Sequence, residues 1–277
     1  MGSFNFTIYE APNVLERDVL CIRVIKHQSQ DALIVKTIPS AFPGIVFQAK
    51  NGLPVIEKIA TKHAVIENLP IFFLHGLGAE PSTMYFTEGV YTIFQIVFKP
   101  KALYTVFGLG FEAMQGGILL PNEIGAETLL KSLLVAKSDA ACVKLMFQFL
   151  TSKLASNGQR DILVERSLDY IDQNIGLITV SELCKTLNIS ERSLEKRFAD
   201  VVGIPAQTYI RVKRVNKAID LMKTGKYERL IDVAAELNFY DQSHFIRDMK
   251  ALSLLSPKSL TQQVKDFQLD QTGYSYS

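Results

Sequence analysis

The sequence contains few of the side chains that bind transition metals. Its 277 residues include only three cysteines and four histidines. The histidines (His27, His63, His75 and His244) form no His-x-His pair, whereas a metal-dependent barrel enzyme needs a cluster of histidine and carboxylate ligands. We therefore expect no metal site, no cofactor and no catalytic centre. An enzyme built on the front half is the least favoured alternative, and metal analysis of the purified protein would test it.

Paired cysteines, membrane spans and export signals are not indicated either. Cys21, Cys142 and Cys184 lie far apart and cannot all pair, so we expect free thiols in a reducing cytoplasm. No apolar run is long enough to cross a bilayer. The N-terminal residues have no basic segment before an apolar one, so no signal peptide is expected. The sequence thus predicts a cytoplasmic protein without a membrane partner.

The chain also lacks a charge bias. The formal net charge is +2, and residues 1–159 hold 13 basic and 12 acidic side chains against 17 and 16 in the remainder. Neither half is basic, so any affinity for DNA has to come from local clusters of cations. With 48% hydrophobic and 21% charged residues the chain is globular, and its length is sufficient for two domains.

The pattern of the front half indicates strands. Residues 91–98 are β-branched and aromatic and stop at a Lys-Pro pair, and residues 71–74 form another apolar run. Residues 44–49 and 55–59 flank Asn51-Gly52, which predicts a β-hairpin. Short strands separated by Gly, Pro and Asn favour a β-barrel or sandwich.

Helices follow these strands. We expect a short helix after Pro100 and a helical hairpin at about residues 127–156, whose second segment begins at the capping pair Ser138-Asp139. The polar stretch after it marks a predicted boundary between a domain of residues 1–157 and one of residues 158–277. The second domain has helical periodicity throughout. The expected fold class is therefore α+β, with a β-rich front domain and an all-α rear domain.

The rear half contains the same small motif twice. Apolar positions of the first copy recur 50 residues later and, toward the end of the motif, 51 residues later. The pairs are Leu183/Val233, Leu187/Leu237, Ile189/Phe239, Leu194/Phe245 and Phe198/Met249. Each copy has the outline of a helix-turn-helix, whose second helix enters a DNA major groove. The change of offset from 50 to 51 residues predicts that the turn of the second copy is one residue longer than that of the first.

Cap signals place the helices of this rear half. Thr179 and Glu182 form a capping box, and Ser190 caps the next helix. The first helix-turn-helix is expected at about residues 179–202, a linker helix at about 206–224 and the second helix-turn-helix at about 230–251. A helix at about 162–173 precedes them, and a short one is expected after Ser256-Pro257.

A longer set of spaced residues runs through both copies and the linker helix. It consists of Ser190, Leu194, Arg197, Phe198, Gly203, Tyr209, Ile210, Arg211, Arg214, Val215, Ala218, Val233, Ala234, Phe239, Gln242, Ser243, His244, Phe245, Arg247, Lys250, Ser256 and Pro257. In this order and spacing, the stretch from Asp161 to Phe267 resembles the DNA-binding domain of the AraC/XylS family of bacterial transcription regulators. The resemblance implies a DNA-binding regulator.

Four positions depart from the family pattern. Asn238 and Leu254 stand where glycine is usual, and Met249 and Leu260 stand where an aromatic residue is usual. Asn tolerates the left-handed backbone conformation better than other non-glycine residues, so the second turn can form. We expect the first helix-turn-helix to contribute more to sequence choice and the second more to positioning on the backbone.

The front half resembles, more loosely, the cupin-like jelly-roll sensor domains that are joined to this DNA-binding domain. Residues 75–103 carry that resemblance. It implies binding of a small-molecule effector or dimerisation, with the helical hairpin as the dimer contact, which a charge placed on Leu145 or Phe149 would test. The aromatic residues of the front half fit a plain hydrophobic core as well as a ligand pocket, so a purely structural front domain is the alternative. No effector-binding residue is indicated.

Helix geometry selects the residues that would contact DNA. In the first copy, Leu194 and Phe198 face the core, and in the second Phe245 and Met249 do so. The residues left to read bases are Arg192, Glu195, Lys196, Gln242, Ser243, His244 and Arg247. Arg and Lys pair with guanine, and Glu accepts from cytosine.

Each of these assignments has an alternative in which the side chain does not contact DNA. The three residues of the first copy would otherwise form an ordinary solvated helix face. Arg247 would otherwise form an ion pair with Asp241 or Asp248, and Asp248 itself is expected to face away from the groove. Weaker candidates contact phosphate: Ser190, Arg197, Arg211 and Lys250. Arg214 is expected to pack or to form an ion pair instead.

Overall fold

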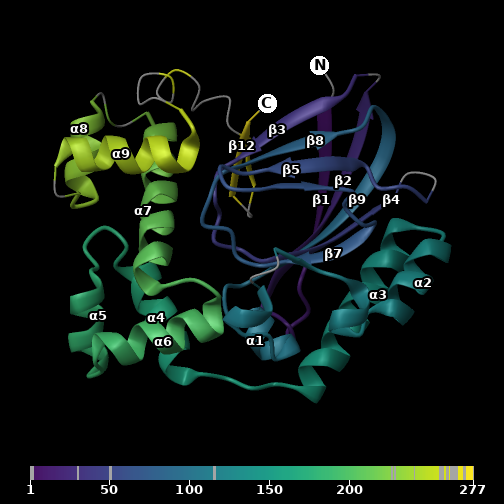
Figure 1. The fold of residues 1–277 in the computed structure, drawn as a ribbon, viewed down its shortest axis with the longest axis horizontal. Coiled ribbons are helices and arrows are strands. Elements are labelled where there is room, and N and C mark those ends of the chain that lie inside the picture. Colours follow the sequence, from purple (N-terminus) through teal and green to yellow (C-terminus); the bar gives the residue numbers. More distant parts are fainter. Residues whose placement is uncertain are drawn as a thin grey trace.

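The computed structural model describes residues 3–29, 31–49, 52–114, 117–225, 227, 229–239, 241–255, 259, 262, 268–270 and 273–276. A front half of antiparallel strands with flanking helices lies beside a rear half of helices (Figure 1). This arrangement confirms the predicted α+β fold class. Among the described residues, no helix combines the length and the apolar character needed to span a bilayer.

Within the described residues the strands form two antiparallel sheets. The first has the order β1 (Ser3–Glu10), β2 (Val19–Ser29), β9 (Gly89–Phe98), β4 (Gly44–Ala49), β7 (Phe72–His75) and β10 (Ile118–Leu119). The second has the order β11 (Gln268–Asp270), β12 (Gly273–Tyr276), β3 (Leu33–Thr37), β8 (Ser82–Phe86), β5 (Ile56–Ala60) and β6 (Val65–Glu67). The predicted strands at 91–98 and 71–74 are confirmed as β9 and β7.

Strand β9 shows why the front half folds as two layers. Its side chains alternate between the two faces of the sheet. Phe94, Ile96 and Phe98 pack in a core shared with the helices of the front half. Tyr91 and Ile93 pack in a separate core with residues of the second sheet. A strand that is buried on both faces has few polar positions, which explains the nearly continuous apolar run in the sequence.

The hairpin predicted around Asn51-Gly52 is wrong. β4 pairs with β7 and β9, whereas β5 pairs with β6 and β8 in the other sheet. The chain crosses between sheets here, and Oε1 of the buried Gln48 accepts hydrogen bonds from the backbone N–H groups of Val55 (3.3 Å) and Ile56 (2.8 Å). Gly52 does adopt a positive φ of 82°, and Asn51 lies outside the described residues. The Asn-Gly signal thus indicated a turn but not the partner of the strand after it.

Helices cover the outer face of the first sheet, as Figure 1 shows. They are α1 (Ala102–Phe107), α2 (Glu127–Val135) and α3 (Asp139–Ser156), with short 3-10 turns at Phe111–Met114 and Pro121–Ile124. The Ser138 hydroxyl accepts a hydrogen bond from the Ala141 N–H at 3.2 Å, so it caps α3 as predicted. The helical hairpin expected at about 127–156 is α2 and α3.

The rear half follows the predicted helix boundaries closely. Its helices are α4 (Ile162–Gln173), α5 (Val180–Leu187), α6 (Glu191–Val202), α7 (Ala206–Lys223), α8 (Leu230–Glu236) and α9 (Gln242–Ser253). The helix expected directly after Ser256-Pro257 lies outside the described residues for the most part, as does Leu260. We refer to α5 and α6 as the first unit and to α8 and α9 as the second unit.

The two halves of the molecule share a hydrophobic core. Ile38, Ala41 and Leu77 of the front half are buried in the same cluster as the apolar residues of α4 to α9. The Asn216 side chain of α7 donates a hydrogen bond to the Pro39 carbonyl at 2.7 Å. Strand β12, which follows the second unit in the sequence, pairs with β3 of the front half. The rear helices are therefore packed against the front half and are not joined to it only by the chain segment between α3 and α4.

Candidate nucleic-acid interface

The two units repeat the same turn at the predicted offset of 50 residues. Asn188 and Asn238 both adopt the left-handed conformation, with φ of 52° and 50°. The Ile189 N–H donates to the Cys184 carbonyl at 3.1 Å, and the Phe239 N–H donates to Ala234 at 3.0 Å, again 50 residues later. This is the hydrogen-bond pattern of a helix that ends in a left-handed residue. The prediction that Asn238 can replace the usual glycine is confirmed.

The second helix of each unit repeats at an offset of 51. Ser190 accepts a hydrogen bond from the Ser193 N–H at 3.3 Å, and Asp241 accepts from the His244 N–H at 2.6 Å. The four core positions of these helices are fully buried: Leu194, Phe198, Phe245 and Met249. The extra residue of the second turn thus lies between Asn238 and the cap Asp241. Both second helices therefore bury the same face.

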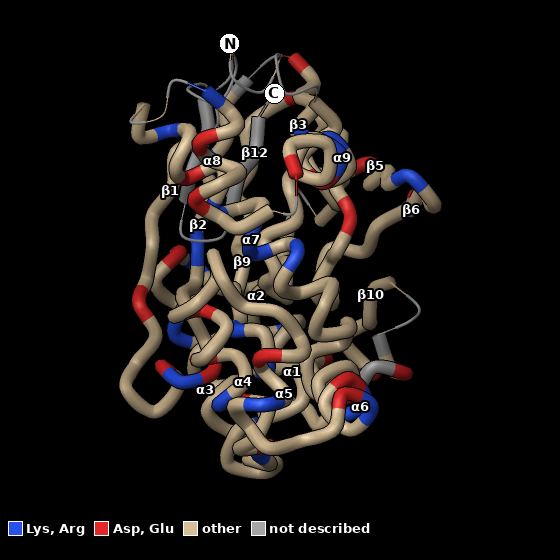
Figure 2. The backbone as a smooth tube through the Cα atoms, turned by 90° about the vertical axis from the view of Figure 1, so that its left-hand side faces the viewer, with Lys and Arg blue, Asp and Glu red and all other residues tan. Residues whose placement is uncertain are grey.

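Helix α7 separates the two units. Its 18 residues correspond to about 27 Å at 1.5 Å per residue. The first unit precedes α7 and the second follows it, and α6 and α9 run in the same general direction in both views (Figures 1 and 2). In Figure 2 both helices carry basic and acidic residues. Successive major-groove segments on one face of a duplex lie about 34 Å apart. The length of α7 is comparable to this spacing, so the two units could reach successive segments.

In the first unit the structure separates the three predicted base-reading residues. Arg192 and Lys196 are exposed on α6. Glu195 is half-buried, and its carboxylate accepts hydrogen bonds from the N–H groups of Ala206 (2.9 Å) and Gln207 (3.4 Å) at the start of α7. This side chain caps α7 in place of a residue directly before the helix. A base contact by Glu195 stays a prediction, and it requires the carboxylate to leave the α7 amides.

The phosphate candidates of the first unit also have roles inside the protein. Ser190 is the N-cap of α6. The Arg197 guanidinium forms an ion pair with Asp161 at the start of α4, with Nη2 2.9 Å and Nε 3.0 Å from Oδ2. Sequence reasoning missed Asp161 as a partner, because a pair 36 residues apart leaves no local signal. Asp161 is visible in the sequence only as a helix cap.

In the second unit, Gln242, Ser243 and Arg247 are exposed on α9. His244 is half-buried, its ring lies edge-on to Phe239 at 5.7 Å, and its Nε2 is 3.5 Å from Asp248 Oδ2. Its position therefore favours a structural role, and a base contact by His244 stays a prediction.

Asp248 is buried and faces away from the exposed side of α9, as predicted from its position. Its Oδ1 accepts a hydrogen bond from Arg211 Nε of α7 at 2.8 Å. Arg211 is thus held against α9 by a carboxylate, in the same way that Arg197 is held by Asp161. The other phosphate candidate of this unit, Lys250, is exposed in the last turn of α9.

Arg214 packs inside the rear half, in agreement with the prediction. Its Nη2 donates to the Ile178 carbonyl at 2.7 Å, and its guanidinium lies 5.5 Å from the Phe239 ring centre. Burial lowers the pKa of Arg214, although Asp248 and Glu182 oppose the shift. It connects the segment before α5 to the turn of the second unit and does not point to solvent as a phosphate contact would.

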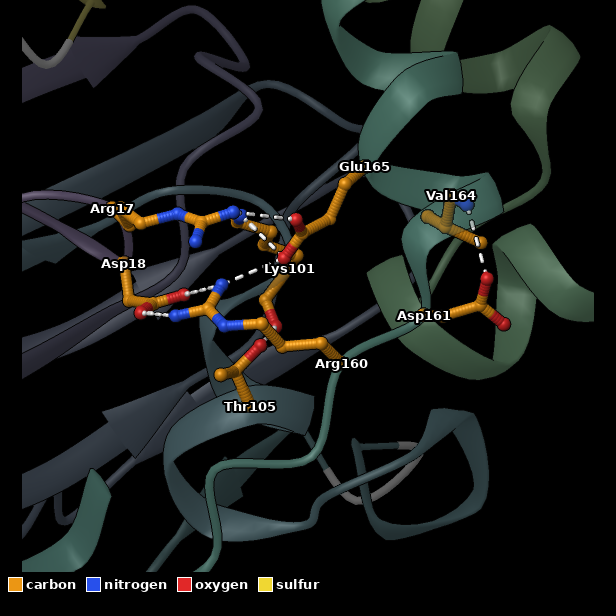
Figure 3. A network of polar contacts seen from close by, with 8 residues as sticks. All are labelled: Arg17, Asp18, Lys101, Thr105, Arg160, Asp161, Val164 and Glu165. Atoms are coloured by element: carbon orange, nitrogen blue, oxygen red, sulfur yellow. Dashed lines mark hydrogen bonds and ion pairs between the residues drawn. The ribbon is translucent and has the colours of Figure 1, made fainter. Parts of the chain in front are cut away.

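A network of charged side chains attaches the rear half to the front half (Figure 3). Arg160, in the segment between α3 and α4, forms a bidentate ion pair with the buried Asp18, at 2.6 and 3.3 Å. Glu165 of α4 accepts from Arg160 (2.7 Å), Lys101 (2.7 Å) and Arg17 (3.1 Å). Burial would raise the pKa of Glu165, but hydrogen bonds from Lys101 and Arg160 outweigh it and lower the pKa below its usual range.

The described residues contain no group of three or more His, Cys, Asp or Glu side chains placed to hold a metal ion. Cys21 and Cys142 are buried, Cys184 is half-buried, and all three are free thiols. Burial raises the pKa of each thiol, so these sulfurs are protonated and poorly nucleophilic at neutral pH.

Comparison with known proteins identifies the rear half. A family model described as a helix-turn-helix domain matches residues 183–263. The F1 operon positive regulatory protein of Yersinia pestis is 29% identical over 101 residues, which are 36% of this chain and 33% of that protein. The HTH-type transcriptional activator AarP of Providencia stuartii is 25% identical over 114 residues, which are 41% of this chain and 78% of that protein. The chain thus spans about a third of the first of these relatives.

Solved structures of ToxT from Vibrio cholerae align with most of the chain. One covers 94% of this chain and 98% of its own, with a TM-score of 0.46 and 14% identity. A second, with unsaturated fatty acid bound to that protein, covers 91% and 98%, with a TM-score of 0.47 and 15% identity. The repeated units, the matched family model and the curated relatives agree: the rear half of this chain contains a helix-turn-helix domain of the AraC type.

Proposed function

We propose that this protein is a sequence-specific transcription regulator that binds double-stranded DNA through both units of its rear half. The observation that carries the proposal is the doubled helix-turn-helix, whose turns and caps repeat at offsets of 50 and 51 residues. The relatives named as a positive regulatory protein and a transcriptional activator support a regulatory role. Such a protein would act in the cytoplasm, where bacterial DNA lies.

Side-chain exposure ranks the residues that would read bases. Arg192 and Lys196 project from the first unit, and Gln242, Ser243 and Arg247 project from the second. Arg and Lys suit the guanine edge, and Gln suits adenine. Glu195 and His244 remain in the proposal with a smaller expected contribution, because each has a partner within the protein.

A genomic binding-site map of the tagged protein tests this proposal. A regulator of this kind should enrich a recurring motif with two segments spaced by about one helical turn. The control is the same protein with both Lys196 and Arg247 changed to Ala, whose map should lose the motif. Equal maps for the two proteins, or no enriched motif, would contradict sequence-specific binding.

We further propose that residues 1–157 form a control domain and residues 158–277 the DNA-binding domain. The core between the two sheets supports effector binding there, because the Tyr91 hydroxyl is buried in it and has no hydrogen-bond partner among the described residues. A ligand with a hydrogen-bonding group would satisfy that hydroxyl. A purely structural front domain is the alternative. Tyr91→Phe tests the hydroxyl: effector-dependent transcription should fall if the hydroxyl binds a ligand, whereas a purely structural front domain would give no effector dependence in either protein.

A homodimer contact through α3 completes the proposal. One face of α3 and Tyr9 line an open, mostly apolar groove of about 670 Å³. The residues of α3 that line it are Ala140, Val143, Lys144, Phe147, Gln148, Thr151, Ser152 and Ala155. Phe149, chosen from the sequence to test dimerisation, instead packs against Phe107 of α1 at 6.2 Å. Phe147→Glu is therefore the sharper test, and sedimentation should show monomers. Thr128→Glu, at an exposed position of α2 outside the groove, is the control for charge and should leave the oligomeric state unchanged.

A further inference from the structure

Asp161 uses its two carboxylate oxygens for two different purposes. Oδ1 accepts a hydrogen bond from the Val164 N–H at 3.1 Å and so caps α4. Oδ2 accepts from Arg197 of α6, at 2.9 Å from Nη2 and 3.0 Å from Nε. The first contact stabilises a helix. The second holds a cation on the helix that carries Arg192 and Lys196.

Arg197 is accessible to a competing anion. Its side chain is 48% exposed, whereas that of Asp161 is 14% exposed. A guanidinium binds a carboxylate and a phosphate with the same planar set of donors. The Asp161 carboxylate therefore occupies the donors that a DNA phosphate would use, and the arginine meets solvent on its other side.

The neighbouring residue is attached to the front half. Arg160 pairs with Asp18, between the strands β1 and β2, and with Glu165 of α4 (Figure 3). Arg160 and Asp161 are consecutive in the chain, so the front half and the first recognition helix are each held by one of two adjacent residues. A displacement of the front half relative to α4 would move Asp161 relative to Arg197.

We propose that Asp161 is an internal competitor for DNA phosphate at Arg197, and that the attachment of Arg160 to the front half sets how strongly it competes. This inference rests on the DNA-binding function proposed above. DNA binding breaks the Asp161–Arg197 pair, so any state of the front half that weakens the pair favours DNA, and by linkage bound DNA favours that state.

The test is Asp161→Asn, because Asn caps helices as well as Asp does. The change keeps the capping oxygen and replaces only the oxygen that holds Arg197. Binding is measured with a random-sequence duplex about three helical turns long, since a phosphate contact does not depend on sequence. We expect Asp161→Asn to tighten binding about two- to fivefold, the range for a partly exposed ion pair. Arg197→Ala should weaken binding and reduce the slope of log affinity against log salt by about 1.

The double variant decides the mechanism. In the Arg197→Ala background, Asp161→Asn should leave the affinity unchanged, because there is no pair left to break. An equal gain in both backgrounds would mean that Asp161 only repels phosphate, and it would overturn the proposal, as would unchanged affinity for Asp161→Asn alone. Asp169→Asn, an exposed position on α4, controls for net charge. If the unaltered protein binds no duplex even at low salt, the proposed function itself fails, which is a separate result.

Discussion

The two helix-turn-helix units have nearly the same backbone and use their polar side chains differently. The first begins with a capping box between Thr179 and Glu182 and ends with Gly203 in the left-handed conformation. The second begins at Arg229, whose side chain forms no cap, and ends with Leu254 in the left-handed conformation at φ 59°. The two units thus share their core positions and their turn, whereas the ends of their helices differ.

The units also differ in what holds their cations. Arg197 of the first unit is paired with Asp161, which follows Arg160, and Arg160 is attached to the front half through Asp18. Arg211 of α7 is paired with Asp248 of the second unit, entirely within the rear half. The first unit is therefore placed to respond to the front half, and the second is tied to the linker helix.

The largest expected effect tests whether the two units unfold together in one cooperative transition. Phe198 and Phe245 are both fully buried in the same cluster. Truncating either to Ala removes apolar contacts and leaves a cavity, which typically costs about 3–5 kcal/mol. Denaturant unfolding should show similar losses for Phe198→Ala and Phe245→Ala, each in a single transition of the rear half. A separate early transition for one variant would show that the units unfold independently.

Asp248→Ala should destabilise the second unit by about 1.5–3 kcal/mol, the range for a hydrogen bond to a charged group. The loss follows because Arg211 and His244 both lose their carboxylate partner. Arg211→Ala is the matched variant, and it should cost as much or more since it leaves the buried Asp248 charged. Hydrogen exchange should report the loosening in α9 before α6. Equal loosening of both helices would contradict a network confined to the second unit.

Base recognition should be divided unequally between the units. Lys196→Ala is expected to weaken binding to a cognate site by about 1–3 kcal/mol and to relax the preference at one base pair. Arg247→Ala should weaken binding as well but change the base preference less, if the second unit mainly positions the protein. Binding-site selection with each variant measures both quantities. Larger changes of preference for Arg247→Ala would reverse the ranking of the units.

The smallest effects concern the helix ends. A left-handed conformation costs a non-glycine residue about 1–2 kcal/mol, and Leu254 is 51% exposed, so its side chain buries little. Leu254→Gly should therefore raise the free energy of unfolding by up to about 1 kcal/mol. Gly203→Ala should lower it by a similar amount, because φ is 89° there although no neighbour crowds an added Cβ. Thermal unfolding of both variants compares the two ends directly.

Local signals explain which parts of the molecule were predictable. The caps at Ser138, Thr179 and Ser190, and the turn at Asn238, depend on residues within a few positions of one another, and the structure has each of them. The hairpin at Asn51-Gly52 failed because the choice of a strand partner depends on distant strands. The position of Glu195 was missed for the same reason, since the α7 amides that it caps lie 11 and 12 residues away.

The sequence by itself determined the helices of the rear half, the doubled motif and its one-residue slip, because helix periods and caps are local. Only the tertiary structure decided which charged side chains stay available on the surface. Arg197, Arg211 and Glu195 all look free in the sequence, and each finds a partner on another helix. Ion pairs and caps between helices depend on packing, and packing is a property of the whole chain. The same packing joins Asp18 to Arg160 and thereby links the front half to the first unit.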